Sequence, residues 1–273
     1  MRNSHYSTSY TYDDMGNILS LKRNGLQDGG TYGLIDNLTY TYQGNQVVKI
    51  DDQVEDPTYK GVFNFMDGAN EELEYEYDKN GNLVKDLNKN ISKIEYNLLN
   101  LPSKMTFGDG KAITYVYDAS GAKLLASYKT ALPASSHTIT YCGNMIYKDD
   151  AFRQILLNGG YITFTDTKPM YHYYLKDHLG NNRVVVSSKG EVEQVTHYYP
   201  YGGIMAESTN ESVQRYKYNG KELDRMHGLD WYDYGARWMA DGRFTTIDPH
   251  AETYVDVSPY AYCGGNPISA IDL

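Results

Sequence analysis

Aromatic and polar residues alternate over much of the chain. In Tyr10–Thr11–Tyr12 and Tyr75–Glu76–Tyr77, two rings flank one polar residue. Side chains of a β-strand point alternately to its two faces, so this spacing places both rings on one face. An aspartate follows directly, and Gly-Asn begins three residues after it, a sequence that favours a tight turn because glycine tolerates positive φ. Since the 3.6-residue apolar spacing of helices is scarce, the pattern predicts an all-β protein with helix confined to short turns.

The strand and turn recur as a repeat. Taking Tyr77, Tyr96 and Tyr117 as equivalent gives steps of 19 residues (96 − 77) and 21 residues (117 − 96), so the repeat is close to 20 residues long. Each unit is expected to be a strand, a turn and a second strand. One such unit cannot bury its own face, so neighbouring units must extend one sheet. Copies of the unit begin at Tyr10, Tyr40, Tyr75, Ile94 and Tyr115.

The middle of the chain is less regular. Ala126–Ser136 is small and polar around Pro133 and suggests a loop, whereas Thr138–Tyr147 and Tyr161–Thr165 have the alternation of strands. We therefore divide the chain into a repeat region, residues 1–135, and a C-terminal region, residues 136–273.

Composition narrows the possible partners. The chain has 29 tyrosines among its 273 residues, and tyrosine suits strands that stack on one another or face water at their edges. The net charge of −10 disfavours binding to nucleic acid or to anionic membranes. No apolar run is long enough for a membrane span, so membrane insertion is not expected, and the segment MRNSHYSTSYTYDD does not resemble a signal peptide. Two cysteines are too few for a disulfide scaffold.

A series of ordered motifs fills the last hundred residues or so, and it resembles the RHS repeat-associated core domain that ends bacterial proteins with tyrosine-aspartate (YD) repeats, of the polymorphic-toxin type. The repeats described above resemble YD repeats. The core motifs are Tyr174–Asn181, Tyr199–Gly202, Tyr218–Glu222, Tyr232–Arg237, Gly242–Phe244, Asp248–Pro249, Ser258–Tyr262 and Asn266–Pro267.

The resemblance implies a fold and a role. YD repeats in this family wind a curved or spiralling β-sheet into a hollow shell, which the core domain closes. We therefore expect a piece of an RHS shell that encapsulates or presents a C-terminal effector in competition between bacteria. Its expected partners are that effector segment and other parts of the shell. Its expected location is outside the cell or on the cell surface, as part of a larger exported protein.

Two other functions fit the sequence. Rows of tyrosine on an exposed sheet face could bind glycans of a cell surface, and outward rather than buried rings would distinguish this function from a shell. In several members of the resembled family, aspartates near the end of the core are linked to self-cleavage. Two neighbouring carboxyl groups can divide the roles of base and acid in such a reaction.

The resemblance assigns these roles to three residues. Asp248 and Asp272 would be the catalytic pair, and Arg243 the cation that orients them or balances their charge. His250–Ala251 follows Asp248–Pro249, where many relatives have a glycine-containing turn. Structural roles for both aspartates, as turn caps, are an equal alternative. Because Asp272 is the penultimate residue, we expect it to be disordered or idle here.

The sequence predicts no cofactor and no metal. The seven histidines include no metal-binding pair, and neither a Gly-x-Ser-x-Gly nucleophile motif nor a phosphate-binding glycine loop is present. The Asp-Gly-Asn turns could offer oxygen ligands to calcium, but they lack the EF-hand order, and turn aspartates usually accept hydrogen bonds from their own backbone.

Overall fold

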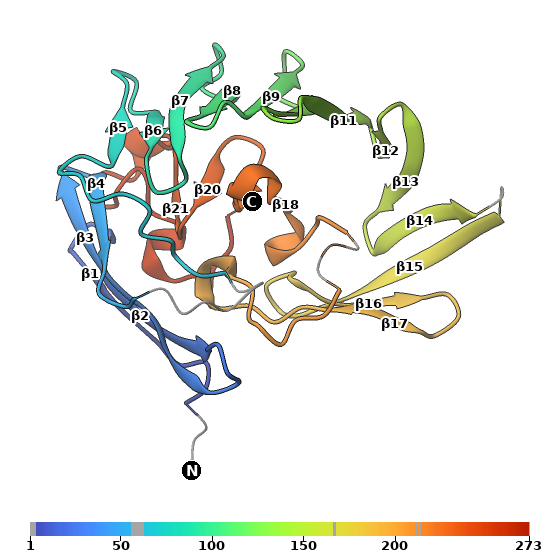
Figure 1. The fold of residues 1–273 in the computed structure, drawn as a ribbon, viewed down its shortest axis with the longest axis horizontal. Helices are drawn as coiled ribbons and strands as arrows, with labels where there is room; N and C mark the ends of the chain where they lie inside the picture. Colours follow the sequence, from blue (N-terminus) through green and yellow to red (C-terminus); the bar gives the residue numbers. More distant parts are fainter. Residues whose placement is uncertain (1–3, 56–62, 166–167, 211, 213, 273) are drawn as a thin grey trace. The chain divides into compact units, whose positions relative to one another are not determined.

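The computed structural model describes residues 4–55, 63–165, 168–210, 212 and 214–272, and in these segments it consists almost entirely of antiparallel strands (Figure 1). Helical structure in the described residues is limited to turns of 3₁₀-helix, each three residues long. The all-β prediction is thus confirmed.

Two compact units share the chain and interleave along it. Unit 1 comprises Met1–Lys89, His197–Ser208 and Arg237–Leu273, and unit 2 comprises Asn90–Thr196 and Thr209–Ala236. The boundary predicted between residues 135 and 136 separates two kinds of motif. It lies inside unit 2, at the start of a strand, Ser135–Cys142.

Unit 1 contains a four-stranded antiparallel sheet in the order β1–β2–β3–β4, the antiparallel hairpin of β5 and β6, and the short antiparallel pair of β20 and β21. A buried ion pair between Arg23 and Asp36, with an N–O distance of 2.6 Å, lies within the first sheet. The turns of this unit are η1 (Pro200–Gly202), η4 (Ala251–Thr253) and η5 (Cys263–Gly265). Its strands are β1 (Thr8–Tyr12), β2 (Ile18–Leu26), β3 (Tyr32–Gln43), β4 (Gln46–Asp52), β5 (Tyr75–Tyr77), β6 (Leu83–Asp86), β20 (Trp238–Ala240) and β21 (Arg243–Phe244).

Unit 2 is an antiparallel sheet in which the strands from β7 to β17 follow one another in sequence order (Figure 1). The segment 214–236, with the β18–β19 pair, packs on one face of it. Its turns are η2 (Tyr218–Gly220) and η3 (Met226–Gly228). Its strands are β7 (Ile91–Tyr96), β8 (Pro102–Phe107), β9 (Ala112–Tyr117), β10 (Lys123–Thr130), β11 (Ser135–Cys142), β12 (Met145–Lys148), β13 (Ala151–Leu157), β14 (Gly160–Thr165), β15 (Lys168–Lys176), β16 (Asn182–Ser187), β17 (Val192–Val195), β18 (Glu222–Asp224) and β19 (Trp231–Asp233).

The repeat register predicted from Tyr77, Tyr96 and Tyr117 is confirmed. Each of these tyrosines is the last residue of its strand, and the residue after it closes the same turn. Asp78 accepts backbone N–H groups two and four residues ahead through one side-chain oxygen, and the pattern recurs in both other turns. Gly81 and Gly121 adopt positive φ, and Asn100 does so where the weaker copy lacks glycine. The turn residue is thus selected by backbone geometry.

The loop expected at Ala126–Ser136 is wrong over most of its length. Ala126–Thr130 continues β10, and β11 begins at Ser135, so the connection consists of residues 131–134. Ala126 and Tyr128 are buried there against the neighbouring strands, because a small residue beside a ring fits the space between them. Packing therefore overrides the turn preference of this segment.

Candidate functional site

One arginine in unit 1 joins the two aspartates that the sequence singled out. Nη2 of Arg237 lies 2.7 Å from Oδ2 of Asp272 and 3.0 Å from Oδ2 of Asp248. The arginine precedes β20, and its guanidinium lies 3.6 Å from the centroid of the Phe244 ring, a cation–π contact. One guanidinium thus contacts both carboxylates.

Backbone contacts hold this triad in place. The Asp248 N–H donates to the carbonyl of Pro259 at 3.0 Å, and Oδ1 of Asp248 accepts the N–H of His250 at 2.8 Å. The Arg237 side chain is 9 % exposed and each carboxylate is 27 % exposed. The arginine is therefore anchored inside the unit, while both acids stay within reach of water.

Arg243 does not occupy the predicted position beside the aspartates. It donates to the Tyr77 hydroxyl at 2.8 Å and is buried. The physical reason is strand geometry: Phe244 contacts Arg237, and adjacent residues of a strand point to opposite faces, so Arg243 points away. The cation that contacts the pair is Arg237. Asp272, which we expected to be disordered or idle, contacts Arg237.

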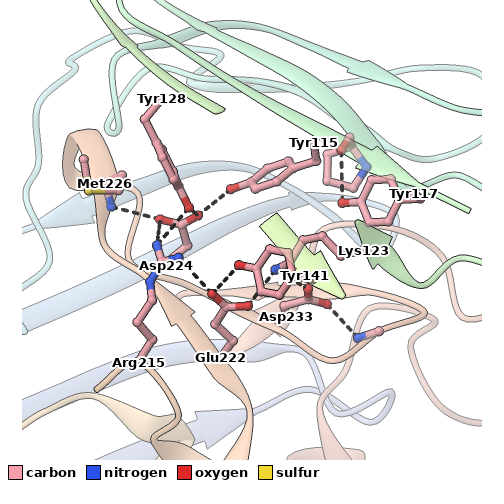
Figure 2. Close-up of polar contacts among 12 residues, drawn as sticks. Tyr115, Tyr117, Lys123, Tyr128, Tyr141, Arg215, Glu222, Asp224, Met226 and Asp233 are labelled. Carbon is pink, nitrogen blue, oxygen red and sulfur yellow. Dashed lines mark hydrogen bonds and ion pairs between the residues drawn. The ribbon is translucent and has the colours of Figure 1, made fainter. Parts of the chain in front are cut away.

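A second, larger group of charged residues lies buried or half-buried in unit 2, where segment 214–236 meets the sheet (Figure 2). Nζ of Lys123, from β10, lies 2.9 Å from Glu222 and 2.7 Å from Asp233. Arg215 contacts Glu222 at 2.9 Å and Asp224 at 3.1 Å. We call these five residues the ion cluster: Lys123, Arg215, Glu222, Asp224 and Asp233.

Tyrosines of the sheet complete the ion cluster. Tyr115 and Tyr128 donate to Oδ2 of Asp224 at 2.8 and 2.6 Å, and Tyr141 donates to Oε1 of Glu222 at 2.7 Å (Figure 2). These rings come from β9, β10 and β11. Tyrosines of three neighbouring strands therefore donate their hydroxyl groups to carboxylates of segment 214–236, which we call the core segment.

The charges of the ion cluster fix its ionisation. Burial alone would raise the pKa of Glu222, but Lys123 and Arg215 outweigh it and lower that pKa to about 2. Burial would lower the pKa of Lys123, whereas Glu222 and Asp233 raise it well above its usual value. Both partners are thus charged at neutral pH, and each compensates the desolvation of the other.

Asp86 in unit 1 is a buried carboxyl for which the compensation is weaker, because burial raises its pKa by more than Lys89 and Arg243 lower it. It is 1 % exposed, its Oδ1 accepts the Lys89 N–H at 3.0 Å, and its Oδ2 has no hydrogen-bond partner among the described residues. Burial, and secondarily the negative charge of Asp241, raises the pKa of Asp86 to about 7. The folded structure therefore favours the neutral form of this carboxyl well above the usual pH range of an aspartate.

The ion cluster was not predicted from the sequence. Lys221–Glu222 and Asp233 lie in quoted core motifs, but Lys123 and Arg215 lie outside them. The available signal was the presence of Tyr115 and Tyr141 in predicted strands, because their hydroxyls need hydrogen-bond partners once the rings are buried.

The described residues contain no group of three or more His, Cys, Asp or Glu placed to hold a metal ion. In the same residues, no helix is long and apolar enough to cross a membrane.

Comparison with curated proteins gives two relatives of much greater length. The chain is 31% identical over 222 residues to salivary gland surface protein 1 of Aedes aegypti, a match that covers 72% of this chain and 6% of that protein. It is 27% identical over 259 residues to the tRNA3(Ser)-specific nuclease WapA of Bacillus spizizenii, covering 86% of this chain and 11% of WapA. No family model matches the chain.

Solved structures share the fold over nearly the whole chain. A chain of the TcdB2-TccC3 crystal structure superposes with a TM-score of 0.64 at 20% identity, covering 97% of this chain and 16% of that one. A chain of the Tc holotoxin pore of Photorhabdus luminescens gives a TM-score of 0.54 at 16% identity, covering 98% and 18%. The chain thus spans less than a fifth of these relatives. With its YD turns and ordered core motifs, the chain belongs to the RHS repeat-associated core family with YD repeats.

Proposed function

We propose that this chain is a part of an RHS shell, in which the core segment closes on the YD-repeat sheet and the shell encapsulates or presents a C-terminal effector. The shared fold with toxin-complex chains supports this function. The relatives' names, a nuclease and a surface protein, fit an effector-bearing protein that acts outside the cell or on its surface.

The ion cluster is the observation that carries the proposal. Burying charged side chains is costly unless each is paired, so the cluster holds together only in one arrangement of segment 214–236 on the sheet. A shell needs a wall that stays closed. A binding site that opens and closes would have to separate these paired charges each time it opened, which is costly.

The tyrosines support the same function. Rings of the repeats and of the core are buried, and these include Tyr40, Tyr75, Tyr115, Tyr128, Tyr218 and Tyr232. Buried rows fit a shell wall better than a glycan-binding surface. Binding of surface glycans stays a prediction, which glycan-array screening would test.

Protease protection tests the shell function. In the longest natural chain that contains this sequence, we expect the effector segment to resist trypsin in the wild type and to be digested in a Lys123→Met variant. The matched control is Lys93→Met, because Lys93 pairs with Glu95 on the surface, where both side chains are well exposed. Equal protection in all three proteins would contradict a shell held closed by the ion cluster.

A second candidate function is self-cleavage, which the convergence of Asp248 and Asp272 on Arg237 favours. One aspartate would take a proton from a water that attacks the peptide carbonyl, and the other would give a proton to the departing nitrogen. Arg237 would keep the first carboxylate ionised. The substrate would be a peptide bond downstream of Asp272 in a longer chain.

Mass spectrometry of a chain extended past Leu273 with its natural downstream sequence tests self-cleavage. We expect cleavage in the wild type and in Arg243→Lys, and none in Asp248→Asn, Asp272→Asn or Arg237→Gln. An intact wild-type extension, or cleavage that persists in the double aspartate variant, would leave the triad with a structural role. Neither result bears on the protease protection of the shell.

A further inference from the structure

The two faces of the unit 2 sheet differ in what they contact. Tyr141 on β11 points to the core segment, and the strand register carries this inner face onward: Tyr141 pairs with Ile146, Ile146 with Gln154, and Gln154 with Thr163. On β15 the inner face holds His172, which pairs with Tyr161. Residues at the alternate positions therefore form an outer face.

The outer face changes character along the sheet. On β10 and β11 it carries Ser127, Lys129, Thr138 and Thr140, as expected for a face in water. From β13 to β15 it carries large apolar side chains that are exposed by 37 to 55%. We call these residues the aromatic patch: Phe152, Leu157, Phe164, Tyr171, Tyr173 and Leu175.

The aromatic patch is about as large as the largest apolar patches on the surfaces of monomeric proteins. A phenylalanine or tyrosine has roughly 150–250 Å² of surface, so at this exposure the six residues leave on the order of 500 Å² of apolar area accessible. This is at the upper end of about 300–600 Å² found for the largest patch on monomeric proteins. A standard protein interface needs about 800 Å² per partner, so the patch alone supplies more than half of that area.

Charge and shape select the partner. Every described residue of the outer face on β14 and β15 is uncharged, although the chain as a whole carries −10. Two copies of a protein with this net negative charge repel one another through most of their surfaces. That repulsion is weakest where the uncharged face of one copy lies against the uncharged face of the other. A regular antiparallel sheet face is also self-complementary, since two such faces pack about 10 Å apart with interdigitating side chains.

Three rings of the outer face, on β12, β13 and β14, lie edge to face rather than in one plane. Phe152 meets Tyr147 at 77° and Phe164 at 65°, so these rings pack edge to face and present no common plane for stacking. Tyrosine, phenylalanine and leucine on a face that is uncharged over β14 and β15 are instead the composition of the buried centre of a protein interface. We propose that the aromatic patch is a two-fold interface on which a second copy of this chain docks, sheet face to sheet face.

Sedimentation equilibrium of the 273-residue chain, from low to high micromolar concentration, tests the proposal. We expect a monomer–dimer equilibrium that Tyr173→Lys weakens at least about tenfold, as the loss of a central contact does. The control is Val116→Lys, because Val116 is 44% exposed on the same outer face but lies on β9, outside the patch. A monomer at every concentration, or a dimer insensitive to Tyr173→Lys, overturns the proposal.

A spin label outside the patch detects the dimer of the otherwise unchanged protein, so this test does not depend on whether a patch variant folds. Cys142 is exposed at the end of β11 and pairs with Met145 of β12, on the outer face beside the patch. A nitroxide on Cys142, in a Cys263→Ser background, should give an intermolecular dipolar signal that disappears in Tyr173→Lys. No dipolar signal in the wild type overturns the proposal. So does a monomer that floats with phosphatidylcholine–phosphatidylglycerol vesicles, since the patch would then bind lipid.

Discussion

Glu222 and Asp86 are both buried carboxyl groups on short strands, yet their surroundings differ. Glu222, in unit 2, contacts Lys123 and Arg215 at 2.9 Å and accepts the Tyr141 hydroxyl at 2.7 Å. Asp86, in unit 1, has one backbone N–H on Oδ1 and no partner on Oδ2 among the described residues. The first carboxyl is held ionised and the second is driven toward its neutral form.

The difference gives the two units opposite responses to pH. The pKa of Glu222 is lowered by its cations, so its stabilising effect is complete above the unfolded pKa and is lost as pH falls toward 2. The pKa of Asp86 is raised, so the folded state binds its proton more tightly than the unfolded state. Its contribution to stability therefore falls as pH rises from about 4 to 7.

The two tryptophans allow the units to be followed separately. Trp231 lies in unit 2 and Trp238 in unit 1, and both are fully buried. A Trp238→Phe background leaves fluorescence that reports on unit 2, and Trp231→Phe leaves fluorescence that reports on unit 1. Each variant is compared with a protein that carries the same tryptophan substitution, so the effect of that substitution on the unfolding free energy cancels in the difference.

Breaking the ion cluster should have the largest effect. Lys123→Met leaves Glu222 and Asp233 without their shared cation, so we expect unit 2 to lose about 3–5 kcal/mol of unfolding free energy. Urea unfolding of the Trp238→Phe protein measures this. Lys93→Met in the same background should change the value by less than about 0.5 kcal/mol, because its ion pair is exposed. A similar loss in both variants would show that burial is not the cause.

Acid should weaken unit 2 without any substitution there. Between about pH 4.5 and pH 2 the unfolded chain takes up a proton that folded Glu222 resists, which costs about 3 kcal/mol at 1.36 kcal/mol per pKa unit. The urea midpoint of the Trp238→Phe protein should fall over this range. Glu222→Gln should flatten that fall, and an unchanged slope in the variant would assign the acid sensitivity to other carboxyls.

Asp86→Asn should stabilise unit 1 at alkaline pH. The amide keeps the acceptor for the Lys89 N–H and removes the charge that burial disfavours. We expect the unfolding free energy to rise by about 2 kcal/mol at pH 8. This is less than the whole pKa shift of Asp86 corresponds to, because water and protein relax around an ionised group. The gain should shrink as the pH falls and should be small at pH 4, close to the usual pKa of an aspartate. A variant that is equally stabilised or destabilised at both pH values would mean that Asp86 does not titrate in the folded state.

The Arg237 triad should have the smallest effect on stability. Its carboxylates are partly exposed, so solvent screens them more than the ion cluster. Arg237→Gln should cost about 1 kcal/mol in unit 1, measured in the Trp231→Phe background. A loss as large as that of Lys123→Met would place the triad among the main supports of the fold.

Local pattern was enough to predict the strands and turns. Tyr-x-Tyr followed by aspartate and glycine defines each repeat because strand alternation and the positive-φ turn are properties of adjacent residues. Asn100 shows the limit of this reasoning, since it adopts the same conformation without being glycine. The segment 126–130 shows another, because burial of Tyr128 decides its structure.

Charge partners were predictable only in part. Asp248 and Asp272 were identified from resemblance, and both contact one guanidinium. The choice between Arg237 and Arg243 depends on the face of β21 to which each side chain turns: Phe244 contacts Arg237, so Arg243 points to the opposite face. Lys123 and Glu222 are about a hundred residues apart, so only the three-dimensional fold brings them together. Sequence spacing carries no information on such a pair.

Carboxyl ¹³C NMR titration of the folded chain, with the Asp86 and Glu222 resonances assigned from Asp86→Asn and Glu222→Gln, tests most directly whether partners set the charge of buried carboxyls here. We predict that Asp86 titrates near pH 7 and that Glu222 stays ionised down to the onset of acid unfolding. Asp86 and Glu222 titrating together near pH 4, as free side chains do, would contradict the account.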